Sequence, residues 1–190
     1  MFHAERSGLA AWACVTSGGV LALSSHLADL TSHGRPDDTA ARLVNVIAAT
    51  CAAGLAGGIY GLNAIHQHRL GRAGAFGTSL TYIGLMVWIV GGLNLILLSP
   101  VPFLLILLGT AVQAIGMLIL GTSILRKGVM SGWKRYVPLL NGAWFFTQFI
   151  LQLPLLIGQG WHPFFTLLFS LWGILWMLVG FVVLKQTYQS

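Results

Sequence analysis

Charged residues divide this chain into long apolar stretches and short polar ones. Residues 7–28 and 43–65 carry no charge, and each is long enough for one helical crossing, because a bilayer core needs about 20 residues. Residues 73–125 and 136–184 are also free of charge but too long for a single crossing. We predict that prolines and glycines break these two stretches near 99–102 and 158–163, where a helix cannot continue.

The sequence therefore predicts an all-α integral membrane protein, a six-transmembrane-helix bundle that forms one domain over residues 1–190. The connection at 29–42 is the longest, and 66–72 is expected to be a short basic turn. The predicted spans are about 7–28, 43–65, 76–98, 103–125, 138–157 and 163–184.

Composition supports this interpretation. The chain is 56% hydrophobic and 7% charged, whereas a soluble domain carries about 25% charged residues. The net charge of +6 does not indicate nucleic-acid binding, because the cations flank apolar spans and form no face interleaved with aromatic residues. We interpret residues 7–28 as a retained span, not a cleaved signal peptide, since Ser17, Gly18 and Gly19 dilute the apolar run.

The distribution of cations predicts the orientation. With both termini inside, eight of the ten Lys and Arg residues lie on the inner side, and three of the four acids lie outside. The positive-inside rule then predicts cytoplasmic N- and C-termini, in a plasma membrane of bacterial type. The inner cations are Arg6, Arg69, Arg72, Arg126, Lys127, Lys134, Arg135 and Lys185.

A weak repeat marks the inner ends of the second, fourth and sixth spans, where a glycine precedes a basic residue by five positions. Three helical hairpins of related design would explain this spacing. A packing glycine followed by a cation that reaches the interface would explain it equally well. The pairs are Gly61 with His66, Gly121 with Arg126, and Gly180 with Lys185.

Small residues in the second and sixth spans predict close helix packing, because glycine lets two helix backbones approach where no hydrophobic force drives association. A ligand lying against the backbone is the alternative. The predicted helix-packing positions are Gly54, Gly57, Gly58, Gly61, Gly173 and Gly180.

Uncharged amides occupy the middle of the fourth and fifth spans. Asn141, Gln148 and Gln152 share one face of the fifth span with Trp144, and Gln113 is expected at a depth similar to that of Gln148. These side chains would either hydrogen-bond between helices, at about 0.6–2 kcal/mol each, or line a pocket for a polar or conjugated small molecule. Both interpretations stay open at this point.

The loop between these two spans contains Arg126, Lys127, Lys134 and Arg135. Cations at the membrane surface attract anionic lipids at about 1 kcal/mol each, so we expect lipid contact there. Topology alone would also explain the basic character of this loop.

Neither a metal site nor a cofactor is clearly implied. The histidines lie near span ends, and His26 with His162 form a weak candidate pair for a haem or pigment. The loop at 29–42 contains Asp29, His33, Asp37 and Asp38, which could bind a metal but are more typical of a solvated turn. Cys14 and Cys51 are expected to be buried thiols without a disulfide.

No charged side chain lies inside any predicted span, which disfavours proton relays, ion-coupled carriers and membrane-interior catalysis. The preferred hypothesis is therefore a non-catalytic membrane protein, a subunit or interaction partner in an assembly with other subunits or copies of itself. The alternative is a protein that binds or transports a small solute or lipophile through the amide and aromatic face. An enzyme acting at the outer loop is a third, weaker hypothesis.

Overall fold

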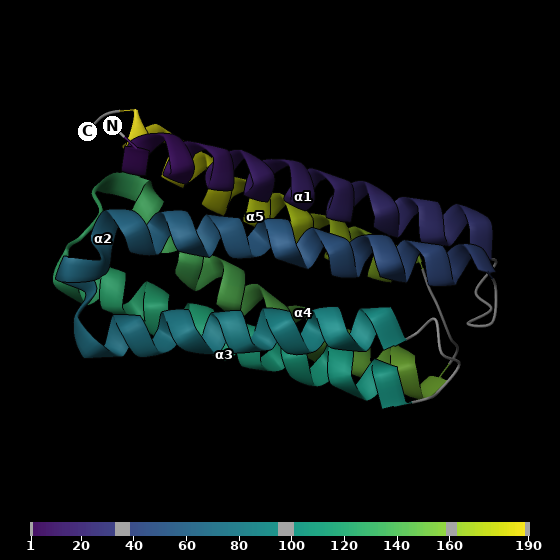
Figure 1. The fold of residues 1–190 in the computed structure, drawn as a ribbon. Helices are drawn as coiled ribbons and strands as arrows, with labels where there is room; N and C mark the ends of the chain where they lie inside the picture. Colours follow the sequence, from purple (N-terminus) through teal and green to yellow (C-terminus); the bar gives the residue numbers. More distant parts are fainter. Residues whose placement is uncertain (1, 33–38, 95–100, 159–162, 189–190) are drawn as a thin grey trace.

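A computed structural model describes residues 2–32, 39–94, 101–158 and 163–188. Within these ranges the regular structure is entirely helical, which confirms the predicted class (Figure 1). The elements are α1 (Phe2–Ser32), α2 (Thr39–Asn94), α3 (Val101–Lys127), a 3₁₀ helix η2 (Gly132–Tyr136), α4 (Val137–Gly158) and α5 (Pro163–Thr187).

Helix α2 turns back on itself at Gly71 and forms two arms (Figure 1). These arms correspond to the second and third predicted spans. Gly71 has φ 68° and ψ −173°, a conformation that is available to glycine and costly for other residues. The predicted turn at 66–72 is therefore wrong in extent. Apart from Gly71, its residues continue the two helical arms up to the bend.

The helices form two groups of three (Figure 1). In the first group, α1 packs against the first arm of α2 and against α5. In the second group, α3 packs against the second arm of α2 and against α4. The α2 bend connects the two groups, and α5 also contacts α4 and α2.

Glycine lies at the close contacts within both groups. A Cβ added at Gly57 would lie 2.6 Å from the carbonyl oxygen of Ala10, and one at Gly180 would lie 2.8 Å from that of Ala11. In the second group, a Cβ at Gly84 would lie 2.5 Å from the Gly109 carbonyl oxygen and would collide with the backbone nitrogen of Gln113. The helix backbones thus approach as closely as small-residue packing permits.

The predicted packing glycines lie at these surfaces as well. Gly54 and Gly58 face Ser17 and Cys14 of α1, respectively, and Gly61 faces Val183 of α5. On α5, a Cβ at Gly173 would lie 2.6 Å from the Gly18 carbonyl oxygen of α1.

This arrangement bears on the proposed hairpins. Helices α4 and α5 follow one another in the chain, yet α5 contacts α1 more extensively than it contacts α4. The third hairpin therefore differs in packing from the first two, whose helices lie tightly side by side. A common origin of the three stays a prediction.

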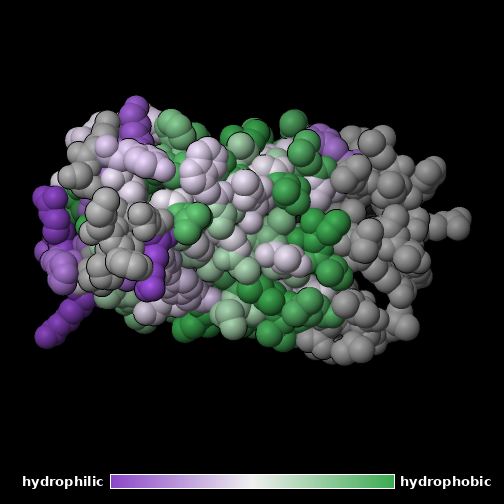
Figure 2. Space-filling view, turned by 45° about the horizontal axis from the view of Figure 1, so that its top comes forward, coloured by the Kyte–Doolittle hydropathy of each residue, from purple (hydrophilic) through white to green (hydrophobic). Residues whose placement is uncertain are grey.

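Both termini lie at the same end of the bundle as the α2 bend and η2 (Figure 1). Hydrophilic residues gather at this end, and apolar residues cover much of the flank seen in Figure 2. Within the described residues, five helical segments are long and apolar enough to cross a membrane. They are Arg6–Ser24, Val46–His66, His68–Leu93, Leu104–Lys127 and Thr166–Thr187.

Large apolar side chains remain exposed on the outside of the bundle. Leu9, Leu23, Leu104 and Ile150 are each at least 65% exposed. Such exposure is costly in water, and it is compatible with an integral membrane protein whose outer surface contacts the lipid bilayer.

Replacing Gly84 by alanine tests the close packing of α2 against α3. We expect Gly84→Ala to lower the free energy of unfolding by about 1–3 kcal/mol, because its Cβ meets backbone that cannot move aside. The matched control is Gly19→Ala, whose nearest neighbour is the flexible Met177 side chain at 3.7 Å. Unfolding of both variants in mixed micelles would measure the difference, and equal stability would contradict tight packing at Gly84.

Candidate functional site

The buried amides meet at the interface of α3 and α4. Nε2 of Gln113 donates a hydrogen bond to Oδ1 of Asn141 at 3.4 Å, and both residues are completely buried. The expected alignment of Gln113 with Gln148 is therefore replaced by contact with Asn141. The two helices cross with an offset that the sequence pattern does not encode.

Gln148 is also buried, but it lies two helical turns from Asn141, about 10 Å along the axis of α4. Gln152 lies on the same helix, and its side chain is outside the described residues. The amides of α4 thus form a line along the helix, of which only the Asn141 end contacts Gln113.

Aromatic rings connect the amide interface to the other helix group. The ring of Trp172 on α5 lies 5.3 Å from that of Trp88 on α2 and 6.5 Å from that of Phe145 on α4, measured between centroids. Trp144 donates its indole N–H to the carbonyl oxygen of Leu168 at 3.1 Å. These contacts hold α4 against α5, where the two groups of helices meet.

Several polar atoms in this region are buried without a hydrogen-bond partner. They are Oε1 of Gln113, Nδ2 of Asn141, Oε1 of Gln148, and the indole nitrogens of Trp172 and Trp176. Such atoms cost about 1–3 kcal/mol each unless water or a ligand satisfies them. We name Gln113, Asn141, Gln148, Trp172 and Trp176 the amide–indole cluster.

Two cavities in the described structure lie away from this cluster. The larger, of about 510 Å³, lies between the α2 bend and the end of α3. The smaller, of about 260 Å³, lies between α1 and the first arm of α2, near Ser17 and Thr50. None of the amide–indole residues lines either cavity.

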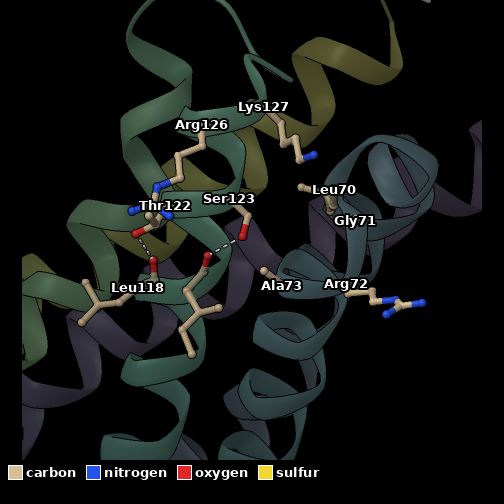
Figure 3. Close-up of a pocket in the computed structure, with 10 residues that line it drawn as sticks. Leu70, Gly71, Arg72, Ala73, Leu118, Thr122, Ser123, Arg126 and Lys127 are labelled. Atoms are coloured by element: carbon tan, nitrogen blue, oxygen red, sulfur yellow. Dashed lines mark hydrogen bonds between the residues drawn. The ribbon is translucent and has the colours of Figure 1, made fainter.

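The larger cavity is bordered by cations, and we call it the basic groove (Figure 3). The Arg126 guanidinium turns back towards Thr122, and the Lys127 ammonium extends towards Leu70, whereas Arg72 points away from α3 (Figure 3). Arg126 and Lys127 are exposed and form no ion pair or hydrogen bond with other described residues. The full lining is Leu70, Gly71, Arg72, Ala73, Leu118, Ile119, Thr122, Ser123, Arg126 and Lys127.

The four loop cations predicted to contact lipid fall into two pairs. Arg126 and Lys127 line the groove, whereas Lys134 and Arg135 belong to η2 and are half-buried. Arg135 donates to the hydroxyl oxygen of Tyr136 at 2.7 Å and stacks over its ring at 4.8 Å. Arg135 is therefore engaged within η2, and only the first pair borders the groove.

Two histidines, His26 and His66, contact residues of another helix. Nε2 of His26 lies 2.9 Å from the hydroxyl oxygen of Ser170, which joins α1 to α5. His66 is buried and lies 2.9 Å from Oε1 of Gln186, which joins α2 to α5. His162 and residues 33–38 of the outer loop lie outside the described residues. Among the residues that are described, no group of three metal-ligating side chains occurs.

Cys14 and Cys51 are both buried and free. The Cys14 thiol donates to the carbonyl oxygen of Trp176 at 3.3 Å, so it serves as another contact between α1 and α5.

Trp172 and Trp176 of the amide–indole cluster, Trp88 beside Trp172, and Gly71 and Arg72 of the basic groove were not predicted as site residues. The depth of the tryptophans within their spans was a usable signal, since buried indoles need a partner for their N–H groups. For the groove, Gly71 between Arg69 and Arg72 was a usable signal of a bend.

Comparison with known proteins adds no assignment, because no protein-family model, curated protein or solved structure matches this chain.

The amide contact can be tested by a double-mutant cycle with Gln113→Met and Asn141→Leu. Each single variant leaves one buried amide without its partner and should lose about 1–3 kcal/mol of unfolding free energy. The double variant removes both polar groups, so we expect it to be more stable than the sum of the single effects predicts, with a coupling of about 0.6–2 kcal/mol. Strictly additive losses would contradict direct contact between the two side chains.

Proposed function

We propose that this chain is a non-catalytic polytopic membrane protein that works as a subunit or interaction partner within a membrane assembly. The observation that supports the proposal is the side-chain packing at the level of the amides. Gln113 contacts Asn141, and Phe145, one helical turn from Asn141, packs against the ring of Trp172. Neither the basic groove nor the cavity near Ser17 is lined by these residues. A solute crossing the membrane would need a continuous polar path through this region.

The chemistry of the described interior supports the same function. Its buried polar side chains are neutral amides, hydroxyls, indoles and one histidine, and His66 already contacts Gln186. General acid–base catalysis needs a titrating group aimed at a site where substrate can enter, and nucleophilic catalysis needs an activated nucleophile. The interior offers neither arrangement among the described residues.

The outer surface is what remains available for interaction. Large apolar side chains cover the flanks of the bundle, and within the described ranges few residues lie outside the helices. In a bilayer, such a surface contacts lipid or the helices of other subunits. A function in assembly needs no further structure than this surface and the polar ends.

We further propose that the end carrying both termini faces the cytoplasm of a bacterial-type plasma membrane. The support is that Arg69, Arg72, Arg126, Lys127 and Lys185 gather at this end, as the positive-inside rule requires of a cytoplasmic face.

A reporter fused after Ser190 tests this orientation. Fused at this position, a fluorescent protein that matures only in the cytoplasm should fluoresce. A phosphatase that folds only outside the cytoplasm should be inactive at the same position. The reverse pattern would overturn the proposed topology. A matched fusion within the loop at 29–42 should give the opposite signals.

A second function, binding of a small polar solute, is favoured by one observation. The amide–indole cluster places two acceptors and three donors in the protein interior without partners among the described residues. A small molecule that both donates and accepts hydrogen bonds would satisfy part of this set, because Gln148 lies about 10 Å from Asn141 along α4.

Native mass spectrometry after extraction in gentle detergent distinguishes the two functions. Under the assembly proposal, the 20.4 kDa chain should leave the membrane together with a second chain or further copies in fixed stoichiometry. A monomer without partner chains would contradict it. An absorption spectrum of the same sample would reveal a haem or pigment.

A lone chain that carries one small-molecule mass would instead support the second function. The variant Gln148→Leu should then lose that mass while remaining folded. The matched control is Thr147→Val, which removes an exposed hydroxyl on the neighbouring position of α4. Retention of the mass in Gln148→Leu would exclude Gln148 as a binding residue.

A further inference from the structure

The basic groove combines exposed cations with a regular change in polarity along α3. Its lining follows two ridges of residues spaced four apart, which lie one above another on a helix. One ridge is Leu118, Thr122 and Arg126, and the other is Ile119, Ser123 and Lys127. Each ridge passes from an aliphatic side chain to a hydroxyl and then to a cation.

This order matches the chemical order of a phospholipid that enters from the bilayer. Acyl chains lie deepest, ester groups follow, and the phosphate lies at the surface. The ridges extend over eight residues, about 12 Å at the rise of an α-helix, which is the scale of a headgroup with the upper part of its chains.

The hydroxyl level is already oriented by the helix. Thr122 donates to the Leu118 carbonyl oxygen at 2.7 Å, and Ser123 donates to the Ile119 carbonyl oxygen at 2.9 Å (Figure 3). Their oxygens keep lone pairs, while the cations above them keep all their donors, because neither Arg126 nor Lys127 is bonded to another described residue. The groove therefore carries positive charge without a described counter-charge at the level of Arg126 and Lys127.

The opposite wall is the bend of α2. The left-handed conformation of Gly71 places Leu70, Gly71 and Ala73 across from α3, and a Cβ added at Gly71 would lie 3.8 Å from Cε of Lys127. Leu70, Gly71 and Ala73 of this wall have no polar side chain, and the side chain of Arg72 points away from α3 (Figure 3). The volume of about 510 Å³ is sufficient for a phosphate-bearing headgroup.

We propose that the basic groove binds one anionic phospholipid, with its phosphate between Arg126 and Lys127, its ester groups at Thr122 and Ser123, and its acyl chains along Leu118 and Ile119. The same cations would attract a free phosphate, but a free phosphate would make no contact with the aliphatic lower part of the groove. This site goes beyond the proposed function in assembly, and it requires no partner chain.

The experiment uses the delipidated full-length protein in a neutral detergent. Added phosphatidylglycerol should raise its thermal unfolding midpoint in a saturable manner, and phosphatidylcholine with the same acyl chains should have a much smaller effect. Native mass spectrometry of the same samples should show one phosphatidylglycerol retained per chain.

The double variant Arg126→Gln/Lys127→Gln should weaken phosphatidylglycerol binding about 30-fold, which corresponds to about fivefold for each cation. The control Arg6→Gln/Lys185→Gln removes the same charge from exposed positions at the same end of the bundle, outside the groove. It should leave binding nearly unchanged. The variant Arg126→Lys/Lys127→Arg retains both charges and should retain the lipid.

Equal losses in the groove and control variants would overturn the proposal, because they would indicate diffuse attraction to the basic end. Stabilisation by inorganic phosphate equal to that by phosphatidylglycerol would overturn the lipid as occupant and assign a free anion. If the double variant unfolds, Lys127→Gln alone, at an exposed side chain, should still show about a fivefold loss. These outcomes are independent of whether a partner chain co-purifies.

Discussion

The close approach of helix backbones at glycine is the constraint on which this structure depends. Where lipid surrounds a bundle, apolar side chains gain little by leaving it, so helices associate through dispersion contacts and interhelical hydrogen bonds. At Gly84 and Gly109 the second arm of α2 approaches α3 closely, and at Gly173 and Gly180 α5 approaches α1 closely. A Cβ at any of these four positions would meet the backbone of the opposite helix.

This packing also determines the environment of the amides and indoles. The glycine contacts bring Gln113 next to Asn141 and bury both, while Trp172 is enclosed by rings from α2 and α4. This packing leaves single polar atoms such as Oε1 of Gln148 without a hydrogen-bond partner among the described residues. The contacts that hold the helices together therefore also bury these amides and indoles.

The bend at Gly71 connects fold and electrostatics. It reverses α2 at the end of the bundle where the termini and η2 also lie, so cations distant in sequence come together there. Since Gly71 also forms part of a wall of the basic groove, one residue with a left-handed backbone contributes both to the topology and to the shape of this groove.

The helical class, the approximate helix limits and the gathering of cations at one end could be predicted from the chain, because charge-free length and flanking charge are local properties. Gln113, Asn141 and the glycines were also predicted as candidate contact positions. The contact of Gln113 with Asn141, the packing of α5 on α1, and the different environments of Arg126 and Arg135 could not be predicted in this way. Those outcomes depend on the crossing offset of distant helices, which side-chain packing sets across the whole bundle and no local period encodes.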